Sequence, residues 1–477
     1  MARSKLGRNN STSSSGLKSR LESFWRDLVK LPKKNIFAPI FALLIVLVIT
    51  GVGFSAQNIP RVIDSTSSST NSPESKKQTE SAVSSSPKAP ASPKSSPTPS
   101  AQPVYADNWL GFEQPLSTCQ LQETQNITGA GAKGFPARQS IPSTGNIKIA
   151  IIPVDFSNAV GSGDPQTLFR DDVNQMVSWA QHFSRGKLSY EVDLSATSWI
   201  RAPRGADWYT CTACGKGSSV DKQPREAAIQ ELITAADPIY DFTGVDYLYF
   251  VLPEEAELQY GTAPIGGGNF NSSEGQFFAL AYGEMGAGTG YRGDRTRIWD
   301  HVVHEILHGQ GFISHGPSNG SGYYITTDNW GASKAVTSWE AFLNGWFDSN
   351  EVLCLNKDSL NKDVFISLDT IDNFGAGKES AMIRLNSQEL LILERRGPGP
   401  FTNLCSTCYR PTESGFTAYK INVNAAYYRD DSDPNGDSKN FWSYLGPQGK
   451  PIITSYVEYS GVRVTRISDT QVKISVS

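Results

Sequence analysis

The chain has 477 residues, which is enough for about two to three domains of ordinary size. Its 43 Lys and Arg residues nearly balance 47 Asp and Glu residues, so the net charge of −4 excludes a dominant basic surface and argues against nucleic acid as a partner. Aromatic residues make up 10% of the chain, so it can bury a sizeable core and is not disordered throughout.

The N-terminal part has the pattern of a membrane anchor. Residues 1–34 carry nine Lys or Arg residues against two acids, and residues 35–55 carry no charge. As a helix, the apolar run 36–54 matches a hydrocarbon core of about 30 Å. A cleaved signal peptide is an alternative, but Gly53-Phe54-Ser55 is a poor cleavage site, and the flanks disfavour a buried core helix. We therefore predict a single-pass cell-membrane protein with a cytoplasmic tail at 1–34, a transmembrane helix at 35–55, and all later residues extracellular.

The next segment, 56–105, is dominated by Ser, Pro, Thr and Lys and has almost no large apolar side chains. Such a segment cannot bury enough surface to offset the entropy lost on ordering. We predict a disordered linker that holds the following domain away from the membrane.

Residues 106–365 are expected to form the first folded domain. Apolar and β-branched runs predict strands, and apolar residues at helical spacing predict helices. In chain order we expect a strand at 147–156, a helix at 164–185, a strand at 188–194, a helix at 226–236 and a strand at 247–252. This strand–helix–strand order favours an α/β or α+β core.

The segment 296–310 contains most of the chain's unusual chemistry. Four of the five histidines lie between His301 and His315. Apolar residues recur four apart on one face of the expected helix, and the other face carries the polar residues His301, His304, Glu305 and His308. Asp294 or Thr296 is expected to cap the start, and Gly309 with Gly311 to end the helix.

The pattern His304-Glu305-x-x-His308 is that of zincin metallopeptidases. Residues four apart on a helix point the same way, so the two imidazoles can bind one zinc ion. Glu305 lies beside them and can act as the general base toward a zinc-activated water. His301 is expected to support the site or the fold rather than to bind the metal, and His182 to be packed or exposed.

A third zinc ligand is still needed. The spacing after Gly311 typical of metzincins would place it at Ser314, and His315 is one residue later. Since Ser is a poor zinc ligand, we favour a one-residue bulge that presents His315. Asp328 and Glu340 are the fallback ligands.

The C-terminal residues 366–477 are expected to form a β-rich domain, with short strands at 381–385, 389–394, 416–423 and within 451–477. A possible calcium loop lies here, because oxygen-bearing side chains alternate as in the first half of a calcium-binding loop at Asp431, Asp433, Asn435 and Asp437. A solvated acidic turn is the alternative, since Trp442 stands where such a loop has a Glu.

The six cysteines include two Cys-x-x-Cys pairs, Cys211 with Cys214 and Cys405 with Cys408. We favour structural disulfides over a zinc or redox site, because the anchor places this part in an oxidising compartment. The pairing is left open among about 15 possibilities. A switch in which Cys119 blocks the zinc is a further alternative.

From about residue 147 to 423, the chain resembles secreted bacterial metallopeptidases of the immune inhibitor A type. The resemblance rests on IKIAIIPVDFSN, FSRGKLSYEVDLSATSW, HEILHGQGF, SWEAFLNGWF, ELLILERR and GFTAYKINV, in that order. It implies an α+β fold with a zincin-like, metzincin-like catalytic domain and a β-rich C-terminal part. It also implies that His304 and His308 bind metal and that Glu305 is the general base.

Two positions depart from that family's pattern: Ser314 stands at the third-ligand position, and Trp330 stands where the Met-turn has Met. Our leading hypothesis is a membrane-anchored zinc endopeptidase that hydrolyses proteins or peptides. The alternative is a non-catalytic surface binding or adhesion protein on a degenerate metallopeptidase fold. The sequence predicts no oligomeric state.

Overall fold

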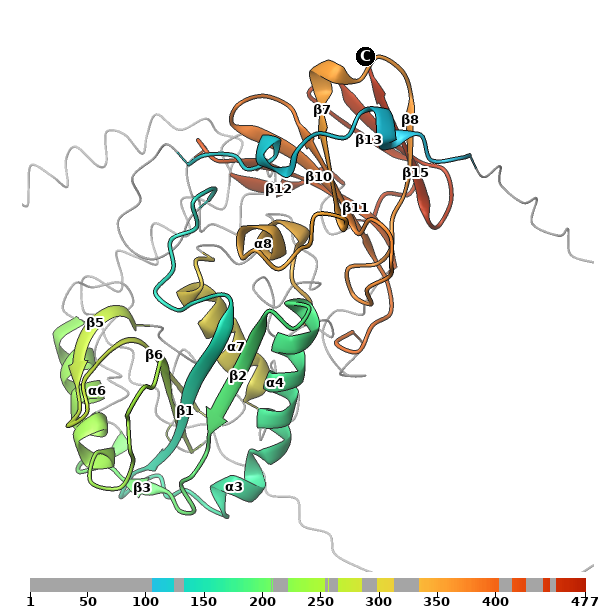
Figure 1. Ribbon diagram of the computed structural model, residues 1–477. Helices are drawn as coiled ribbons and strands as arrows, with labels where there is room; N and C mark the ends of the chain where they lie inside the picture. Colours follow the sequence, from blue (N-terminus) through green and yellow to red (C-terminus); the bar gives the residue numbers. More distant parts are fainter. Residues whose placement is uncertain are drawn as a thin grey trace, which may run out of the picture. The chain divides into compact units, whose positions relative to one another are not determined.

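Figure 1 shows the computed structural model of the chain. The structure describes residues 105–123, 133–206, 208, 222–253, 256, 265–284, 298–312, 334–402, 414–425, 441–446 and 452–477. All of them belong to one compact unit, Ser96–Ser477. Within these residues no helix has the length and apolarity needed to span a bilayer. The expected anchor at 35–55 lies outside them, as does the expected linker at 56–105 except for its last residue.

The first half of this unit is built on a six-stranded mixed sheet of order β2-β1-β4-β6-β5, with β3 paired to β1. Its strands are β1 (Gly145–Asp155), β2 (Leu188–Asp193), β3 (Ile200–Arg201), β4 (Tyr247–Leu252), β5 (Ile265–Asn271) and β6 (Gln276–Glu284). All the pairings are parallel except that of β5 with β6. Helices form the crossovers between β1 and β2 and between β3 and β4, whereas β5 lies between the parallel strands β4 and β6.

Helices cover both faces of this sheet (Figure 1). They are α3 (Pro165–Leu168), α4 (Arg170–Phe183), α6 (Lys222–Ala236) and α7 (Trp299–Gly309). Because side chains alternate along a strand, Ile149 and Ile151 of β1 pack in the core with α4 and α7, whereas Ala150 and Ile152 pack in the core with α6. Burial on both faces explains why β1 reads as a continuous apolar run.

The second half is β-rich. A five-stranded sheet has the order β12-β11-β10-β9-β7 and a four-stranded sheet has the order β13-β14-β15-β8. The strands are β7 (Val352–Asn356), β8 (Val364–Ser367), β9 (Ser380–Arg384), β10 (Glu389–Arg396), β11 (Gly415–Asn422), β12 (Trp442–Tyr444), β13 (Tyr456–Tyr459), β14 (Val462–Arg466) and β15 (Gln471–Val476). Side chains of both sheets share one core, as in a sandwich.

The other face of the five-stranded sheet joins the core of the first half. Ile392 of β10 and Tyr419 of β11 belong to the same buried cluster as α4, α7 and the short helix α8 (Ser338–Leu343). Trp339 of α8 and the nearby Trp346 are buried in this cluster. The two halves therefore share an apolar core.

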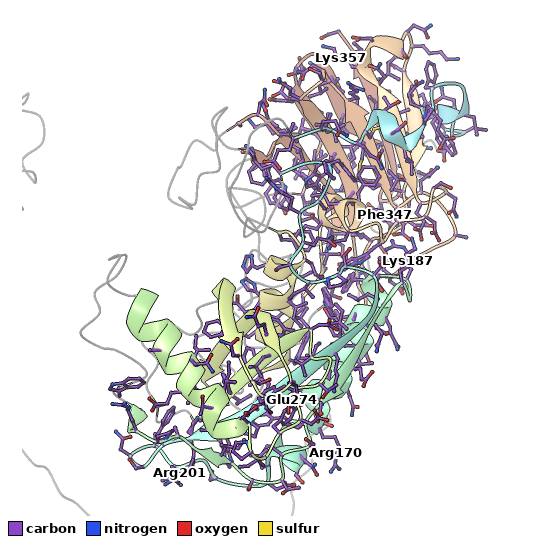
Figure 2. All side chains as sticks on the ribbon, turned by 60° about the vertical axis from the view of Figure 1, so that its left-hand side comes forward. Arg170, Lys187, Arg201, Glu274, Phe347 and Lys357 are labelled. Carbon is purple, nitrogen blue, oxygen red and sulfur yellow. A yellow bond between two sulfur atoms is a disulfide. The ribbon has the colours of Figure 1, made fainter. Side chains whose placement is uncertain are left out.

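Polar contacts strengthen this join. Lys187, just before β2, donates to the carbonyl of Trp346 at 2.8 Å and pairs with Asp348 at 2.8 Å. Arg185 pairs with the carboxylates of Glu351 and Glu379 and lies over the ring of Phe347, 4.5 Å from its centroid. Figure 2 draws Lys187 and Phe347 close together at this join.

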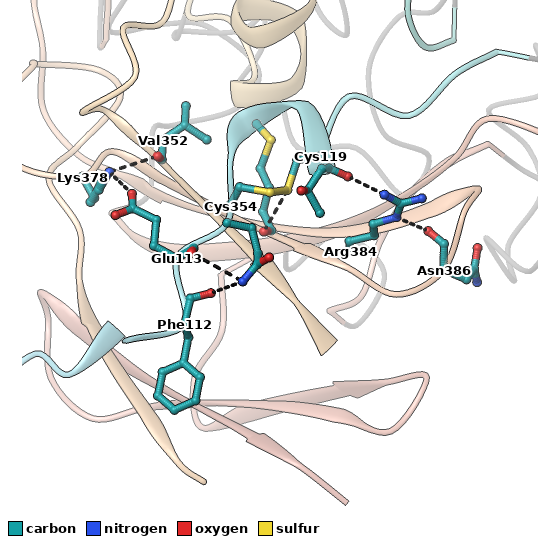
Figure 3. Close-up of a disulfide and its surroundings, with 11 residues drawn as sticks. Phe112, Glu113, Cys119, Val352, Cys354, Lys378, Arg384 and Asn386 are labelled. Carbon is teal, nitrogen blue, oxygen red and sulfur yellow. Dashed lines mark hydrogen bonds and ion pairs between the residues drawn. A yellow bond between two sulfur atoms is a disulfide. The ribbon is translucent and has the colours of Figure 1, made fainter. Parts of the chain in front are cut away.

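The N-terminal described segment is fastened to the β-rich half. It contains the short 3-10 helices Trp109–Gly111 and Leu116–Thr118. Cys119 forms a disulfide with Cys354 of β7, 235 residues later in the chain. Next to it, Lys378 pairs with Glu113 and Arg384 donates to the carbonyl of Thr118 (Figure 3). The segment 105–119 therefore packs on the C-terminal sheets before the chain enters β1.

The fold is mixed α/β, and each expected helix and strand of the first half is found within a few residues. The expected helix 164–185 is divided at Phe169 into α3 and α4, because this buried residue leaves helical geometry with φ −107° and ψ 8°. The β-rich half takes in β7 and β8, so its sheets begin before residue 366.

Candidate metal centre on helix α7

Helix α7 is fixed in place by its apolar side and by a distant acid. Val302, Val303, Ile306 and Leu307 are fully buried in the core beside α4. The Asp172 carboxylate of α4 accepts hydrogen bonds from the backbone N–H groups of Ile298 and Trp299, at 2.7 and 2.8 Å. These are among the amides that a helix start leaves without internal partners, and a negative charge there also suits the helix dipole. The capping residues expected from the sequence, Asp294 and Thr296, lie outside the described residues.

The two glycines end the helix as expected, each for a different reason. A Cβ atom on Gly309 would lie 2.3 Å from Cδ1 of Ile141, so a larger residue there would displace the side chain of Ile141, in the segment before β1. Gly311 has φ +108°. The N–H of Phe312 bonds to the carbonyl of Leu307 and that of Gly311 to the carbonyl of His308, which is the Schellman arrangement.

His304 and His308 converge on one point. Their Nε2 atoms lie 3.2 Å apart, and their rings are nearly perpendicular at 84°. Two nitrogens that each lie 2.0–2.1 Å from a tetrahedral zinc ion would be about 3.3 Å apart. The distance therefore suits two nitrogens that bind one zinc ion.

The end of the helix also sets the tautomer of His308. Its Nδ1 lies 2.8 Å from the backbone carbonyl oxygen of Phe312. A carbonyl can only accept, so Nδ1 carries the hydrogen and the neutral ring keeps its Nε2 lone pair for a ligand. This is the usual second contact of a metal-binding histidine.

Glu305 is buried on the same helix face, with 6% of its surface exposed. One of its oxygens, Oε1, lies 3.3 Å from Nε2 of His301. The other ring nitrogen of His301, Nδ1, lies 2.9 Å from the hydroxyl of Tyr249 on β4. Burial, with contributions from His308 and Lys334, lowers the pKa of His301 to about 3, so its ring is neutral at neutral pH.

The chain is held against α7 on both sides of residues 313–333. Phe312 is held at the helix end, as described above. After residues 313–333, which the structure does not describe, Lys334 pairs with the buried Asp300 of α7 at 2.9 Å. The intervening segment is flanked by two described residues that contact α7, Phe312 and Lys334. It contains His315, Ser314 and Asp328, three of the candidates for the third ligand.

The remaining fallback ligand, Glu340, has a structural role. Its carboxylate accepts from the backbone N–H of Thr337, whose hydroxyl accepts from the N–H of Glu340. This capping box starts α8. Among the described residues, no three His, Cys, Asp or Glu side chains are placed to hold one ion.

Other expected sites lie partly or wholly outside the described residues. These include the possible calcium ligands Asp431, Asp433, Asn435 and Asp437, and the cysteines Cys211, Cys214, Cys405 and Cys408. Cys119 is described, and its bond to Cys354 rules out a switch that blocks the zinc in this state of the chain. The preference for a structural disulfide is thus confirmed for this pair.

The fifth histidine is packed, one of the two outcomes expected from the sequence. The ring of His182 stacks on Phe374 with centroids 4.5 Å apart, and its Nε2 lies 3.1 Å from the carbonyl oxygen of Asp372. Burial lowers its pKa.

Three contributors to the site were not identified from the sequence: Asp172, Tyr249 and the carbonyl of Phe312. The first two act across long sequence separations, and the third acts through its backbone. One signal was available for Tyr249. Side chains alternate along a strand, so β4 places Tyr247 and Tyr249 on the same face of the sheet, where both pack in the core with α7.

Comparison with known proteins adds no assignment. No protein-family model matches the chain, and no curated protein matches it either.

Proposed function

We propose that the chain is a membrane-anchored, extracytoplasmic zinc endopeptidase. The observation that carries the proposal is the 3.2 Å separation of the Nε2 atoms of His304 and His308, with the tautomer of His308 set by the Phe312 carbonyl. Two imidazole lone pairs that converge in this way are a partial zinc site, and Glu305 lies beside them on the same helix. No nucleic-acid partner is proposed, and the substrate class is protein or peptide.

Each residue of the helix face has a distinct task in this proposal. His304 and His308 bind zinc, which when bound acidifies a water molecule and polarises the scissile carbonyl. Glu305 takes a proton from that water as it attacks the peptide carbon and later returns it to the leaving amine. The buried position of Glu305 suits this task, since a carboxylate acts more strongly where few water molecules compete with its partners.

We propose His315 as the third zinc ligand. It follows Phe312 by three residues, which span at most about 11 Å of extended chain, and Phe312 is itself held against His308. An imidazole is a far better zinc ligand than the hydroxyl of Ser314. Asp328 stays the alternative, and the capping role of Glu340 disfavours that residue.

The wider architecture is compatible with the proposal. A mixed sheet, a helix with the metal-binding motif and a β-rich C-terminal half follow one another in the order that the resemblance to immune inhibitor A-type peptidases implies. The basic residues before the apolar run 36–54 support a cytoplasmic N-terminus and an external catalytic part. Calcium at residues 431–437 stays a prediction.

A second function is favoured by two sequence positions. Ser314 at the expected ligand position and Trp330 at the expected Met-turn position are features of a degenerate peptidase. A chain of this kind would be a surface binding or adhesion protein without catalysis. The intact set of His304, Glu305 and His308 argues against it.

Zinc content and casein digestion, with and without a chelator, separate the two functions. We expect the purified protein to hold zinc and to digest casein, and the chelator to stop digestion. Glu305→Gln should lower kcat by about 10²–10⁴-fold with zinc still bound, because the general base is lost and the ligands remain. Glu458→Gln, on β13 in the four-stranded sheet, is the matched control and should keep full activity.

Two results would contradict the proposal. Full digestion by Glu305→Gln would remove the mechanism. A wild-type protein that binds zinc and cleaves neither casein nor short peptides would support the binding protein instead.

A further inference from the structure

His301 and Glu305 are brought together by the helix itself. They are four residues apart on α7, so their side chains lie on the same face, one turn apart. Both side chains are 5% exposed, and Nε2 of His301 lies 3.3 Å from Oε1 of Glu305. This is slightly longer than an ordinary hydrogen bond, as is common for catalytic contacts before the reacting complex has formed.

The far side of the His301 ring is held by the sheet. The Tyr249 hydroxyl lies 2.9 Å from Nδ1, and Tyr249 is fully buried on β4. A neutral imidazole has one donor and one acceptor nitrogen. If Tyr249 donates to Nδ1, then Nε2 carries the hydrogen and directs it toward the Glu305 carboxylate. The opposite tautomer would place a lone pair against that carboxylate, so the arrangement selects the first one.

His301 is therefore placed to orient the base and not to bind the metal. Both of its nitrogens already face a partner, Tyr249 on one side and Glu305 on the other. Its ring lies nearly parallel to that of His304, at 14°, with centroids 6.2 Å apart. The ring that converges with His304 is that of His308.

We propose that His301, itself held by Tyr249, is a positioning residue that fixes the Glu305 carboxylate for proton transfer. The inference rests on the proposed zinc peptidase activity. With Oε1 held by His301, Oε2 is the oxygen that accepts the proton from the attacking water. A carboxylate free to rotate about its last side-chain bonds would spend less time in this orientation, and a misplacement of about 1 Å can cost about 10²-fold in rate.

The test uses variants of the full-length protein, assayed with a peptide substrate. His301→Leu removes the contact with Glu305 and should lower kcat by about 10²-fold while KM and zinc affinity change by less than about twofold. His301→Gln keeps an N–H donor near the position of Nε2. Its kcat should be at least about tenfold higher than that of His301→Leu, an effect that one hydrogen bond can supply. Zinc affinity is measured separately by competition with a chromogenic chelator.

Tyrosine variants give a matched pair. Tyr249→Phe should lower kcat by about three- to tenfold, because it frees the ring of His301 and removes one hydrogen bond. Tyr190→Phe is the control: Tyr190 packs in the same core from β2, and among the described residues no hydrogen-bond partner of its hydroxyl is found. The control should change kcat by less than about twofold.

If His301→Leu alone fails to fold, the double variant His301→Leu with Tyr249→Phe replaces the single variant in the test. The second substitution removes the tyrosine hydroxyl that would otherwise be buried without its partner.

Two readouts separate this inference from the proposed function. If His301→Leu loses zinc affinity in parallel with kcat, or keeps full kcat, the positioning role is overturned. A wild type without peptidase activity overturns the proposed function. In that case crystals of the zinc-loaded wild type and His301→Leu still test the contact. The role of His301 holds if the Glu305 carboxylate moves in the variant, and it is overturned if the carboxylate stays in place.

Discussion

Two buried polar clusters lie in the core that the two halves of the molecule share, and they differ in how their charges are paired. One is the histidine face of α7, formed by His301, His304, Glu305 and His308. The other, which we call the Arg396 joint, consists of Asp372, Glu394 and Arg396. All of these side chains are buried except that of His308, which is partly exposed, so in each cluster a charged or polar group needs a partner.

The Arg396 joint contains its own cation. Arg396 pairs with Asp372 at 2.6 Å and with Glu394 at 3.3 Å. The other oxygen of Glu394 accepts from the N–H of Ser338 and from the hydroxyl of Tyr419, at 2.8 and 3.1 Å. Burial raises the pKa of Asp372 to about 6, against the opposing effect of Arg396. Every contact here joins a donor to an acceptor, which is typical of a structural link between β10 and the start of α8.

The histidine face differs at one place. The Nε2 atoms of His304 and His308 lie 3.2 Å apart, and the Phe312 carbonyl leaves His308 with an acceptor nitrogen toward His304. In the proposed function, zinc is the cation of this cluster, as Arg396 is the cation of the joint. A buried polar cluster that can take up a cation is a candidate site, whereas a cluster with its own cation stabilises the fold.

The largest expected effect is therefore on stability, at the joint. Arg396→Met leaves Asp372 and Glu394 buried without their cation and should lower the free energy of unfolding by about 3–5 kcal/mol. Urea denaturation measures this loss. Zinc affinity at temperatures where the variant is folded should be unchanged. A variant as stable as the wild type would show that the joint contributes nothing to the fold.

Loss of the Cys119–Cys354 disulfide is expected to have the next largest effect. The double variant Cys119→Ala with Cys354→Ala opens a loop of 235 residues and should cost about 2–5 kcal/mol of stability. The same urea denaturation series reports it. Because this bond fastens the N-terminal segment to β7 and does not touch α7, zinc content should stay the same. Loss of zinc in the double variant would mean that the two regions are coupled.

The smallest effect concerns pH and involves His182, which contacts the joint at the carbonyl of Asp372. Burial lowers the pKa of His182 in the fold, so below its ordinary value of 6.5 the unfolded chain binds more protons than the folded one. The stability from the neutral ring is present above 6.5 and is lost as the pH falls. In the presence of a chelator, the free energy of unfolding of the wild type should fall more steeply from pH 7 to pH 5 than that of His182→Gln. An equal dependence on pH in the two proteins would contradict the lowered pKa of His182. Asp372 acts in the opposite direction in both proteins, so the difference between them isolates His182.

Much of the fold was predictable because its signals are local. The apolar spacing and the two glycines located α7 within a few residues, and the apolar run of β1 marked a strand buried on both faces. The faces of α7 were also predictable, because residues four apart share a side whatever surrounds them.

The long-range parts were not predictable from one sequence. Asp172 reaches the start of α7 from another helix, and Tyr249 reaches His301 from a strand. The Cys119–Cys354 bond is one pairing among about 15, and nothing local marks β7 and β8 as members of the C-terminal sheets. These features depend on which elements pack together, which no local pattern specifies.

The central claim is that His304 and His308 share a zinc ion, and anomalous diffraction at the zinc edge tests it most directly. Crystals of the metal-loaded protein should show a peak about 2.0–2.1 Å from the Nε2 atom of each ring, with His315 completing the protein ligands. No peak between the two rings, or a zinc ion bound only elsewhere in the chain, would contradict the account.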